Sequence, residues 1–393
     1  MPPSIRRGFR DPAPDDGPDL AAAIAAEIRA AGPMRFSRYL ERVLYTPGEG
    51  YYSGPDPGVG AGGDFVTAPE LSPVFGECLA RALAPPLRAL SGDVLELGAG
   101  NGTLARSLLG ALDRVHGLPD RYLILEVSGS LRARQESVIA GLPPRQRERV
   151  RWVERLPEAP FRGVVIGNEV ADALVFDVFR ITRAGPVYRG VGLSDDGRDL
   201  CWVDLPADAA LQDFTEAVAH ARGSPLRVGY VSEFRPLLAP WIASLSGCLA
   251  AGALLLVDYG LPRRELYSDE RRGGTLCCYS RHRVHQDPFR SPGCEDVTAW
   301  VDFTTVAEAC CDNGLVLEGF TTQAAFLIEN GYTESCAEIA ESGPLEHRTR
   351  EMAAARRLVM PGDMGERFRV IAASRELPEA LTGFSGLDLM RTL

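Results

Sequence analysis

The chain of 393 residues contains no lysine, so all 42 of its basic side chains are arginines. Without lysine the protein cannot form a Schiff base, attach pyridoxal phosphate or build the lysine-dependent phosphate loop of a Walker-type nucleotide site. It also lacks any apolar run near the roughly 20 residues that cross a bilayer, and the stretch 249–257 is far too short. These absences exclude lysine-based covalent catalysis and predict no membrane insertion.

Basic charge and metal-binding patterns are also scarce. The net charge of −11 argues against a nucleic-acid binder, because neutralising phosphates requires a basic face. The nine cysteines include no Cys-x-x-Cys pair and the five histidines are scattered, so we expect no metal site. We expect His282 to be solvated or structurally bonded rather than catalytic. Arg6 and Arg7 are not followed by the apolar segment of a secretory signal, and with an odd number of cysteines this favours a cytoplasmic protein.

Residues 94–103 combine a short buried strand, a glycine-rich turn and the start of a helix. Three alternate positions of the turn are glycines, namely Gly98, Gly100 and Gly102. Glycine allows unusual φ angles and a close approach of the backbone to a ligand, and a helix N-terminus adds free N–H groups. The stretch therefore predicts a nucleotide-type site.

Two residues distinguish this stretch from the common nucleotide-binding motifs. Thr103 stands where a dinucleotide-binding fingerprint needs Gly or Ala, which makes a nicotinamide oxidoreductase a remote alternative. Glu96 lies inside the strand, two residues before the first glycine, and is an acid that neither motif requires. This acid-x-Gly-x-Gly-x-Gly order resembles motif I of class I S-adenosylmethionine (SAM) methyltransferases, in which the turn faces an amino-acid carboxylate and a ribose.

Strands and helices alternate after the glycine turn. We expect strands at 122–125, 150–153, 164–167, 253–258, 315–319 and 368–373, and an inserted β-meander at 178–205. Repeated βα units predict an α/β fold with a parallel, doubly wound sheet that binds its ligands beyond the C-terminal strand ends. Acids lie within or just past several strands, at Glu96, Glu126, Glu169, Asp172 and Asp258.

The strand-end acids suggest separate roles. Glu126 lies 24 residues after Gly102, where a carboxylate accepts both ribose hydroxyls. Asn168, Glu169 and Asp172 follow the fourth strand, the usual place for the group that orients a methyl acceptor. Carboxylates there would match the planar donor fork of a guanidinium. The i, i+3 spacing of Glu169 and Asp172 predicts one face of a helical turn. Alternatively, both acids only cap the following helix.

Together these stretches resemble the MidA-like family, whose mitochondrial members are arginine methyltransferases that assist assembly of complex I. The match runs in order from about residue 20 to 375, over residues 63–77, 96–102, 125–132, 168–173, 232–233, 258–260, 274–279, 296–303 and 364–368. The resemblance implies a class I methyltransferase (Rossmann-like) core with an N-terminal helical cap, SAM as the cofactor and S-adenosylhomocysteine as its product. It also implies a protein arginine as the acceptor, in a subunit like those of respiratory complex I.

The same resemblance implies the site residues. Asn168, Glu169 and Asp172 would be catalytic, and Glu154 and Leu156 would flank the adenine. The residues implied to bind SAM are Thr67, Pro69, Glu70, Ser72, Glu96, Gly98, Gly100, Asn101, Gly102, Glu126, Val127, Glu154, Leu156 and Asn168.

The predicted organisation has a disordered segment 1–18, a helical cap 19–90 with a loop over SAM, a core 91–375 and a tail 376–393. The core carries insertions at 178–250, 260–303 and 323–360. Val170 and Ala171 stand where the family usually has a large apolar residue, and Val175 and Phe176 where it has a proline. These departures slightly favour a small-molecule O- or N-methyltransferase as the alternative. A SAM-binding assembly chaperone without turnover is a second alternative, and we allow for a homodimer.

Overall fold

The computed structural model describes residues 20–54, 58, 66–280 and 283–393. The segment 1–18, residues 63–65 of the family stretch and His282 lie outside the described residues. Among the described helices, none is both long enough and apolar enough to cross a membrane.

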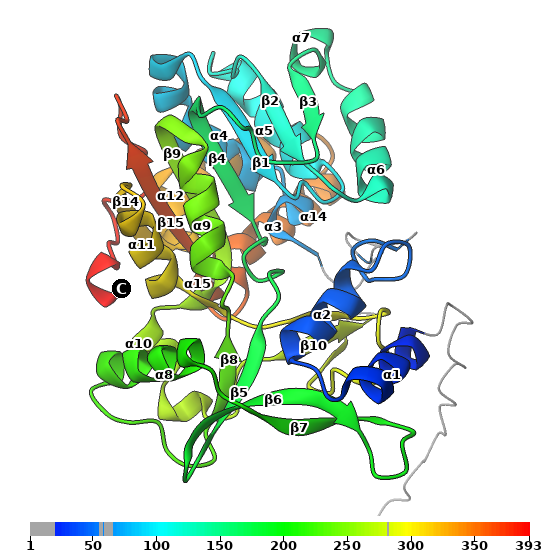
Figure 1. Ribbon diagram of the computed structural model, residues 1–393. Coiled ribbons are helices and arrows are strands. Elements are labelled where there is room, and N and C mark those ends of the chain that lie inside the picture. The colour runs from blue at the N-terminus through cyan, green and yellow to red at the C-terminus, as the bar shows by residue number, and fades with distance from the viewer. Residues whose placement is uncertain (1–19, 55–57, 59–65, 281–282) are drawn as a thin grey trace, which may run out of the picture.

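A seven-stranded path in the order β14-β15-β9-β4-β1-β2-β3 forms the upper half of the molecule in Figure 1, and the short β13 pairs with β9. The bounds are β1 Asp93–Leu97, β2 Tyr122–Leu125, β3 Val150–Val153, β4 Phe161–Asn168, β9 Leu249–Leu261, β13 Val301–Asp302, β14 Val316–Thr322 and β15 Phe368–Arg375. β1 is parallel to both β2 and β4. The predicted doubly wound α/β sheet is confirmed.

One strand departs from the predicted all-parallel arrangement. β15 runs antiparallel between β9 and β14. Thr322, at the end of β14, pairs with Arg369, near the start of β15. The helical insert between these strands therefore returns the chain to the end of the sheet where β14 finished, so the next strand must run backwards.

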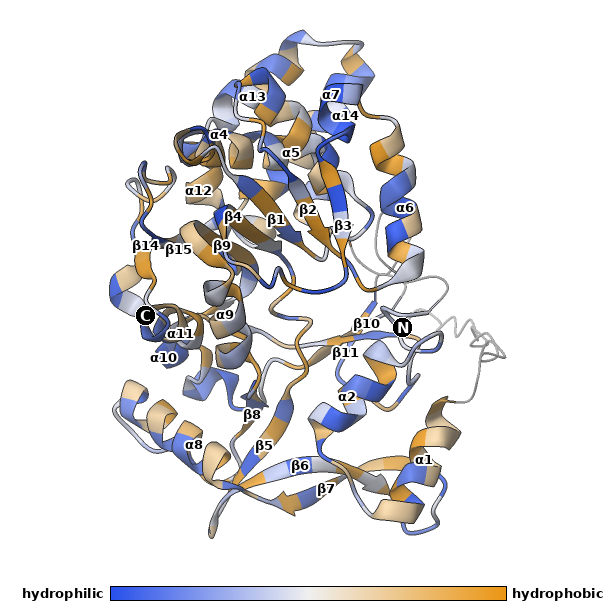
Figure 2. Cartoon of the chain, turned by 45° about the horizontal axis from the view of Figure 1, so that its top comes forward, coloured by the Kyte–Doolittle hydropathy of each residue, from blue (hydrophilic) through white to orange (hydrophobic). Residues whose placement is uncertain are grey.

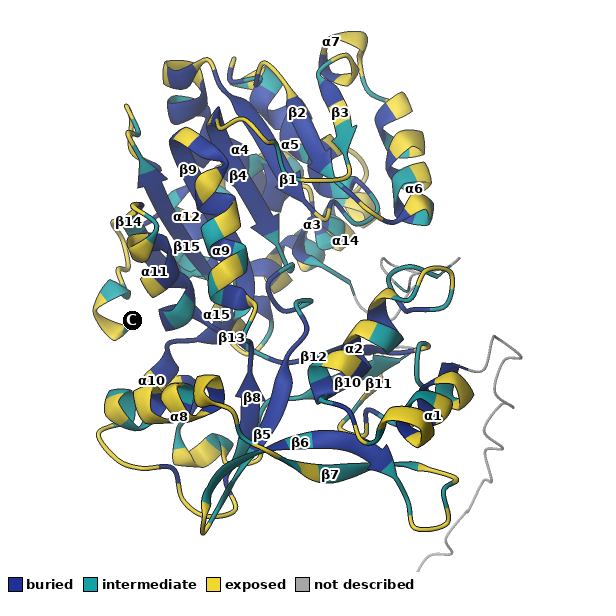
Figure 3. Cartoon of the chain, viewed as in Figure 1, coloured by how far each residue is buried: buried dark blue, intermediate teal, exposed yellow. Residues whose placement is uncertain are grey.

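Helices cover both faces of the sheet, and the strand residues between them are buried (Figure 3). One face carries α4 Val74–Leu90, α5 Thr103–Arg114, α12 Gln323–Glu329 and α14 Leu345–Val359, and the other carries α9 Leu238–Gly247 and α11 Phe303–Asp312. Val94 packs into the first layer and its neighbour Leu95 into the second, as the alternation of side chains along a strand requires. This double cover holds the C-terminal strand ends in fixed positions.

A second unit contains two smaller antiparallel sheets. One has the order β7-β6-β5-β8 and the other β11-β10-β12. Their bounds are β5 Asp177–Thr182, β6 Gly185–Leu193, β7 Leu200–Pro206, β8 Val231–Phe234, β10 Cys277–Ser280, β11 Arg283–His285 and β12 Asp296–Thr298. The helices of this unit are α1 Leu20–Ala31, α2 Phe36–Tyr45, α8 Ala209–Arg222 and α10 Arg263–Leu266. The predicted meander at 178–205 corresponds to β5, β6 and β7.

The segment 19–90, expected as one cap, is divided between the two units. α1 contacts β6, and α2 contacts β5, β6 and β12, so both helices belong to the second unit. α4 instead packs along α5 in the core layer. A short helix, α3 (Ala68–Leu71), precedes α4 and ends at Ser72, and α4 begins after its N-cap residue Pro73.

The remaining elements lie around the core. They are α6 Gly129–Ala140, α7 Pro144–Arg147, α13 Tyr332–Glu341, α15 Met364–Arg367 and the 3-10 turns η1 Asp269–Arg271 and η2 Met390–Thr392. Figure 2 shows both polar and apolar residues along α6. The tail packs on β14, where the N–H of Leu389 donates to the carbonyl of Phe320 (2.8 Å).

Candidate active site

A cavity of about 400 Å³ lies between the C-terminal edge of the central sheet and the second unit. Twelve of the predicted site residues line it, namely Thr67, Pro69, Glu70, Glu96, Gly98, Gly100, Asn101, Glu126, Val127, Asn168, Glu169 and Asp172. Most of these residues lie at the C-terminal ends of β1, β2 and β4 or in the loops that follow, because parallel strands bring these ends to one edge of the sheet. The others belong to α3 and its N-cap. The fold therefore brings distant residues into one cavity, for example Thr67 and Asp172.

The glycine turn after β1 has a backbone that other residues rarely adopt. The φ angles are +57° at Gly98, +54° at Gly100 and +86° at Gly102. A Cβ at Gly98 would lie 3.2 Å from the Val170 side chain, and one at Gly102 would lie 3.2 Å from the backbone of Gln135. The turn thus requires glycine both for its conformation and for close packing.

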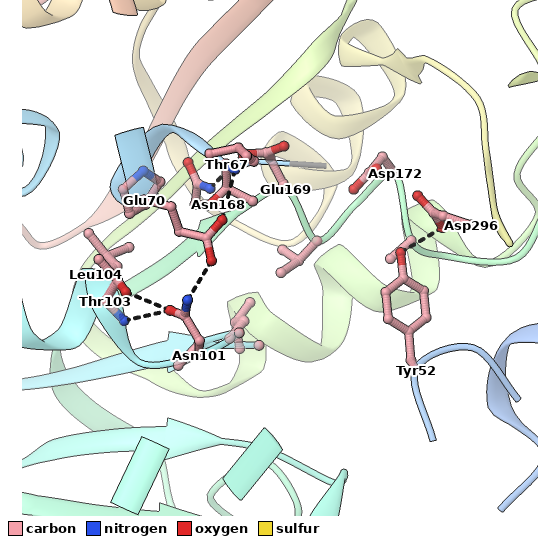
Figure 4. Close-up of a pocket in the computed structure, with 18 of the residues that line it drawn as sticks. Tyr52, Thr67, Glu70, Asn101, Thr103, Leu104, Asn168, Glu169, Asp172 and Asp296 are labelled. Carbon is pink, nitrogen blue, oxygen red and sulfur yellow. Dashed lines mark hydrogen bonds between the residues drawn. The ribbon is translucent and has the colours of Figure 1, made fainter. Parts of the chain in front are cut away.

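The helix α3 is tied to this turn by a polar chain (Figure 4). Asn101 donates its side-chain N–H to Glu70 (2.5 Å), and its oxygen accepts from the N–H of Thr103 (3.0 Å). The second Glu70 oxygen accepts from the N–H of Thr67 (3.1 Å), which closes the N-terminus of α3. The Glu70 carboxylate therefore fixes α3 relative to the glycine turn after β1.

Glu96 is a buried acid in the floor of the cavity. Tyr122 donates its hydroxyl to Glu96 (2.8 Å), and no described arginine forms an ion pair with this carboxyl. Burial raises the pKa of Glu96 to about 8, and the neighbouring Glu126 contributes to the rise. A cationic ligand beside Glu96 would favour its charged form.

Glu126, the residue after β2, is held by two hydrogen-bond donors. Its carboxylate accepts from the N–H of Ser128 (2.8 Å) and from the amide of Gln135 (2.9 Å). The same amide nitrogen donates to the carbonyl of Gly100 (2.9 Å), and the Gln135 oxygen accepts from the indole of Trp152 (2.9 Å). Gln135 thus couples the glycine turn to the carboxylate expected to bind ribose.

We expect Gln135→Met to weaken SAM binding roughly tenfold, the effect of losing one hydrogen bond to a charged group. The change keeps the length of the side chain but leaves Glu126 without its amide donor. Calorimetry measures the effect as the Kd for SAM. In a protein that already carries Glu126→Gln, Gln135→Met should weaken SAM binding only slightly further. If the effects of the two substitutions on the Kd were fully additive, Gln135 would not act through Glu126.

Sequence reasoning did not identify Gln135, although a signal was available. Leu131, Gln135 and Ile139 are the buried residues of α6 and follow one another at intervals of four. A glutamine on the apolar stripe of an amphipathic helix must find buried partners for its amide. Its position between two buried aliphatic residues marked it as a candidate.

The loop after β4 differs from the predicted helical turn. Glu169 has φ +54°, and residues 169–176 form bends and turns without a helix. The prediction that Glu169 and Asp172 share a helical face is therefore wrong. Asp258, inside β9, accepts the N–H groups of Ala171 (2.9 Å) and Asp172 (3.2 Å), which holds the loop in this non-helical path.

The two acids of this loop still face the cavity. Asn168 donates its amide to Glu169 (3.1 Å), and burial raises the pKa of Glu169 to about 8, with a contribution from Asp172. Asp172 accepts from Tyr259 and from Thr298 (3.1 Å) through one oxygen. Its other oxygen and the Asn168 side-chain oxygen are buried without a hydrogen-bond partner among the described residues.

Four predicted cofactor residues do not line the cavity. Gly102 caps α5 beneath the turn, and Ser72 is buried at the end of α3, where its hydroxyl accepts from the N–H of Val74 (3.3 Å). Glu154 points into solvent with 80% of its side chain exposed, and Leu156 packs on the opposite helical layer. The chain directly after β3 lies outside the cavity lining, and that Glu154 and Leu156 flank the adenine stays a prediction.

Several cavity residues come from outside the predicted set. They include Tyr45, Tyr52, Tyr259, Tyr279, Asp296, Trp300, Arg357, Asp363, Met364, Arg367 and Phe368. Most of these lie in stretches that carry the family resemblance. The polar and aromatic side chains of those stretches were the available signal. Because the stretches lie far apart in the sequence, their meeting in one cavity could not be predicted.

The electrostatics of the cavity favour positively charged ligands. Of the described residues that line it, seven are carboxylic acids and two are arginines. SAM carries a sulfonium and an ammonium, so the charge fits. The positive-φ glycine cradle and the unpartnered oxygen of Asn168 fit a polar ligand that approaches the backbone closely. Glu96, Glu126 and the glycine turn are thus the groups suited to hold SAM.

The chain is similar to known methyltransferases. A family model of S-adenosyl-L-methionine-dependent methyltransferases matches residues 78–321. "Protein arginine methyltransferase NDUFAF7, mitochondrial" of Danio rerio is 26% identical over 374 residues, covering 88% of this chain and 84% of that protein. The homologue named from Drosophila melanogaster is 29% identical over 404 residues, covering 90% and 84%. A Burkholderia thailandensis protein crystallised with S-adenosyl-homocysteine is 41% identical, with a TM-score of 0.89 over 97% of this chain and 100% of that chain.

Proposed function

We propose, because the chain belongs to the MidA-like family of SAM-dependent methyltransferases, that its methyl acceptor is an arginine side chain of a protein partner. That the chain is a SAM-dependent methyltransferase follows from the family and from the related structure with bound S-adenosyl-homocysteine. The arginine acceptor is supported by the names of the curated relatives. The observation that carries it in this chain is the pair of carboxyl groups in the loop after β4, the half-buried Glu169 and the buried Asp172, which both line the cavity.

The residues of the loop after β4 suit a guanidinium. When bound, SAM supplies a methyl group on a positively charged sulfur. Glu169 and Asp172 would accept hydrogen bonds from the planar donor fork and direct one nitrogen toward the methyl group. As the new N–C bond forms, that nitrogen must lose a proton, and the pKa of Glu169, raised to about 8 by burial, suits it as the proton acceptor.

We also keep three finer proposals. The partner is a subunit like those of respiratory complex I, as the family resemblance implies. The protein works in the cytoplasm, and its nine free cysteines support a reducing compartment. It forms a homodimer, which light scattering tests directly.

The arginine proposal is tested with methyl-labelled SAM, the purified protein and a lysate separated into protein and small-molecule fractions. We expect label in a protein band, and methylated arginine after acid hydrolysis of that band. Label confined to small molecules would overturn the arginine proposal and indicate metabolite methylation. Label in another amino acid would overturn it as well.

We expect the affinity for SAM to rise between about pH 6 and pH 8, by up to tenfold per unit for one released proton. The pKa of Glu96 is about 8 in the protein without ligand, so the carboxyl is protonated below that pH. A cation nearby lowers this pKa, and binding must then expel the proton. The stability of the protein without SAM should change with pH in the opposite direction. Because the pKa of Glu96 is raised in the folded state, the free energy of unfolding should fall as the pH rises from about 4.5 through about 8.

Calorimetry in two buffers of different ionisation enthalpy measures the released proton. Glu96→Gln should flatten most of the pH dependence. An affinity that does not change over this range in the wild-type protein would show that Glu96 is not coupled to SAM.

A further inference from the structure

One end of the cavity is closed by residues from outside the methyltransferase sheet. Tyr45 ends α2, and Tyr52 follows it in the next turn. Tyr279 and Asp296 are paired across β10 and β12. All four side chains line the cavity together with Asp172.

These residues form a closed frame with the loop after β4. Tyr52 donates its hydroxyl to Asp296 (2.8 Å), and its ring stacks on that of Tyr45 with 5.6 Å between centroids. Tyr45 in turn donates to the carbonyl of Ala173 (2.5 Å), the residue after Asp172. The tyrosine pair thus connects β12 to the loop that carries the acceptor-side acids.

The geometry of β12 brings Asp296 to the same place from the other side. Thr298 donates to Asp172 (3.1 Å). Residues i and i+2 of a strand project from the same face, so Asp296 and Thr298 both point toward this loop. Figure 4 shows Asp172 beside the Tyr52–Asp296 pair. Two carboxylates therefore meet across one small space whose walls are tyrosine rings.

Arg235 lies close to this end of the cavity. Burial raises the pKa of the Asp172 carboxyl, and the hydrogen bond from Tyr259 and the charge of Arg235 offset part of the rise. Arg235 uses its guanidinium to donate to the carbonyls of Asp172 (2.8 Å) and Ala299 (2.5 Å) and lies over the ring of Phe176. It is not among the residues that line the cavity. One oxygen of Asp172 is buried and without a partner among the described residues. The frame thus presents an acceptor oxygen, a second carboxylate and aromatic faces, which are the groups that bind a flat organic cation.

We propose that Asp172 and Asp296, framed by Tyr45, Tyr52 and Tyr279, form the subsite that binds the guanidinium of the acceptor arginine. The subsite rests on the proposed function and assigns substrate recognition to the second unit. In this arrangement Asp296 determines specificity, and Tyr52 holds its carboxylate in place. The sheet then binds SAM, whereas the second unit recognises the acceptor.

Binding of two blocked amino acids to the protein saturated with S-adenosylhomocysteine tests this subsite. The probes are Nα-acetyl-arginine amide and Nα-acetyl-citrulline amide, which have similar shapes but differ in charge. We expect the wild-type protein to bind the arginine probe at least about tenfold more tightly, the contribution of one charge-assisted contact. Asp296→Asn, which keeps an oxygen for Tyr52, should remove this preference, and Tyr52→Phe should reduce it. Ligand-observed NMR titration gives the Kd values.

The chain offers a matched control outside the cavity. Asp208 accepts a hydrogen bond from Tyr188 (2.6 Å) in the second unit, so Asp208→Asn makes the same change in a similar pair. It should leave the preference intact, and the affinity for S-adenosylhomocysteine should be unchanged in every variant.

Equal binding of the two probes by the wild-type protein, no binding of either, or an unchanged preference in Asp296→Asn would overturn the subsite. Failure of the proposed function would instead be seen in the experiment with methyl-labelled SAM, as a labelled product that is not methylarginine.

Discussion

Gly100→Val is expected to abolish SAM binding. Gly100 has φ +54° and lines the cavity, and its carbonyl accepts the Gln135 amide (2.9 Å). A β-branched residue in this conformation costs about 1–3 kcal/mol. Its side chain would also occupy space next to the ligand. Any backbone shift that relieves the strain would break the contact with Gln135. We expect affinity to fall at least ~100-fold, because each 1.4 kcal/mol is a factor of ten.

The measurement is calorimetric titration with SAM, after circular dichroism shows that the variant is folded. Gly110→Val is the matched control, because Gly110 lies within α5, outside the cavity, and no atom lies within 4 Å of an added Cβ. The control should bind SAM normally. A folded Gly100→Val protein with wild-type affinity would refute the position of the cofactor site.

Glu169→Gln should retain SAM binding and lose roughly 100-fold in turnover, the usual effect of removing one positioned acid–base group. The substituted amide keeps an oxygen for the hydrogen bond from Asn168, so the strained loop at φ +54° can persist. It cannot accept the proton that a guanidinium must release. The loss should therefore appear in kcat with little change in the KM for SAM.

Glu154→Gln is the control for this experiment, since it removes the carboxylate just past β3 that points into solvent. We expect full activity, because the exposed Glu154 carboxylate does not line the cavity. Unchanged turnover in Glu169→Gln would reduce Glu169 to a structural role in its loop.

Much of the fold could be predicted from the sequence because its signals are local. The strand at β3 was predicted with the bounds that the structure has, and β1, β2, β4 and β9 each contain the predicted apolar run. Hydrophobic periodicity and glycine positions depend on residues close together in the chain, so they survive without tertiary information. The glycine cradle, Glu96 and Glu126 were predicted for the same reason, because their spacing within one βα unit identifies them.

The tertiary structure alone decided what faces the cavity. Glu154 follows its strand as regularly as Glu126 does, yet the chain turns it into solvent. Gln135 gained its role from contacts with Gly100, Glu126 and Trp152, which lie on three other segments. The meeting of Tyr52 with Asp296 spans 244 positions of the chain. Such contacts depend on how whole units pack, and no local pattern encodes that packing. The sequence by itself predicted the glycine turn and the strand-end acids as the SAM site, because their signals are local. The packing of the second unit on the sheet decided which tyrosines and acids meet beside the loop after β4.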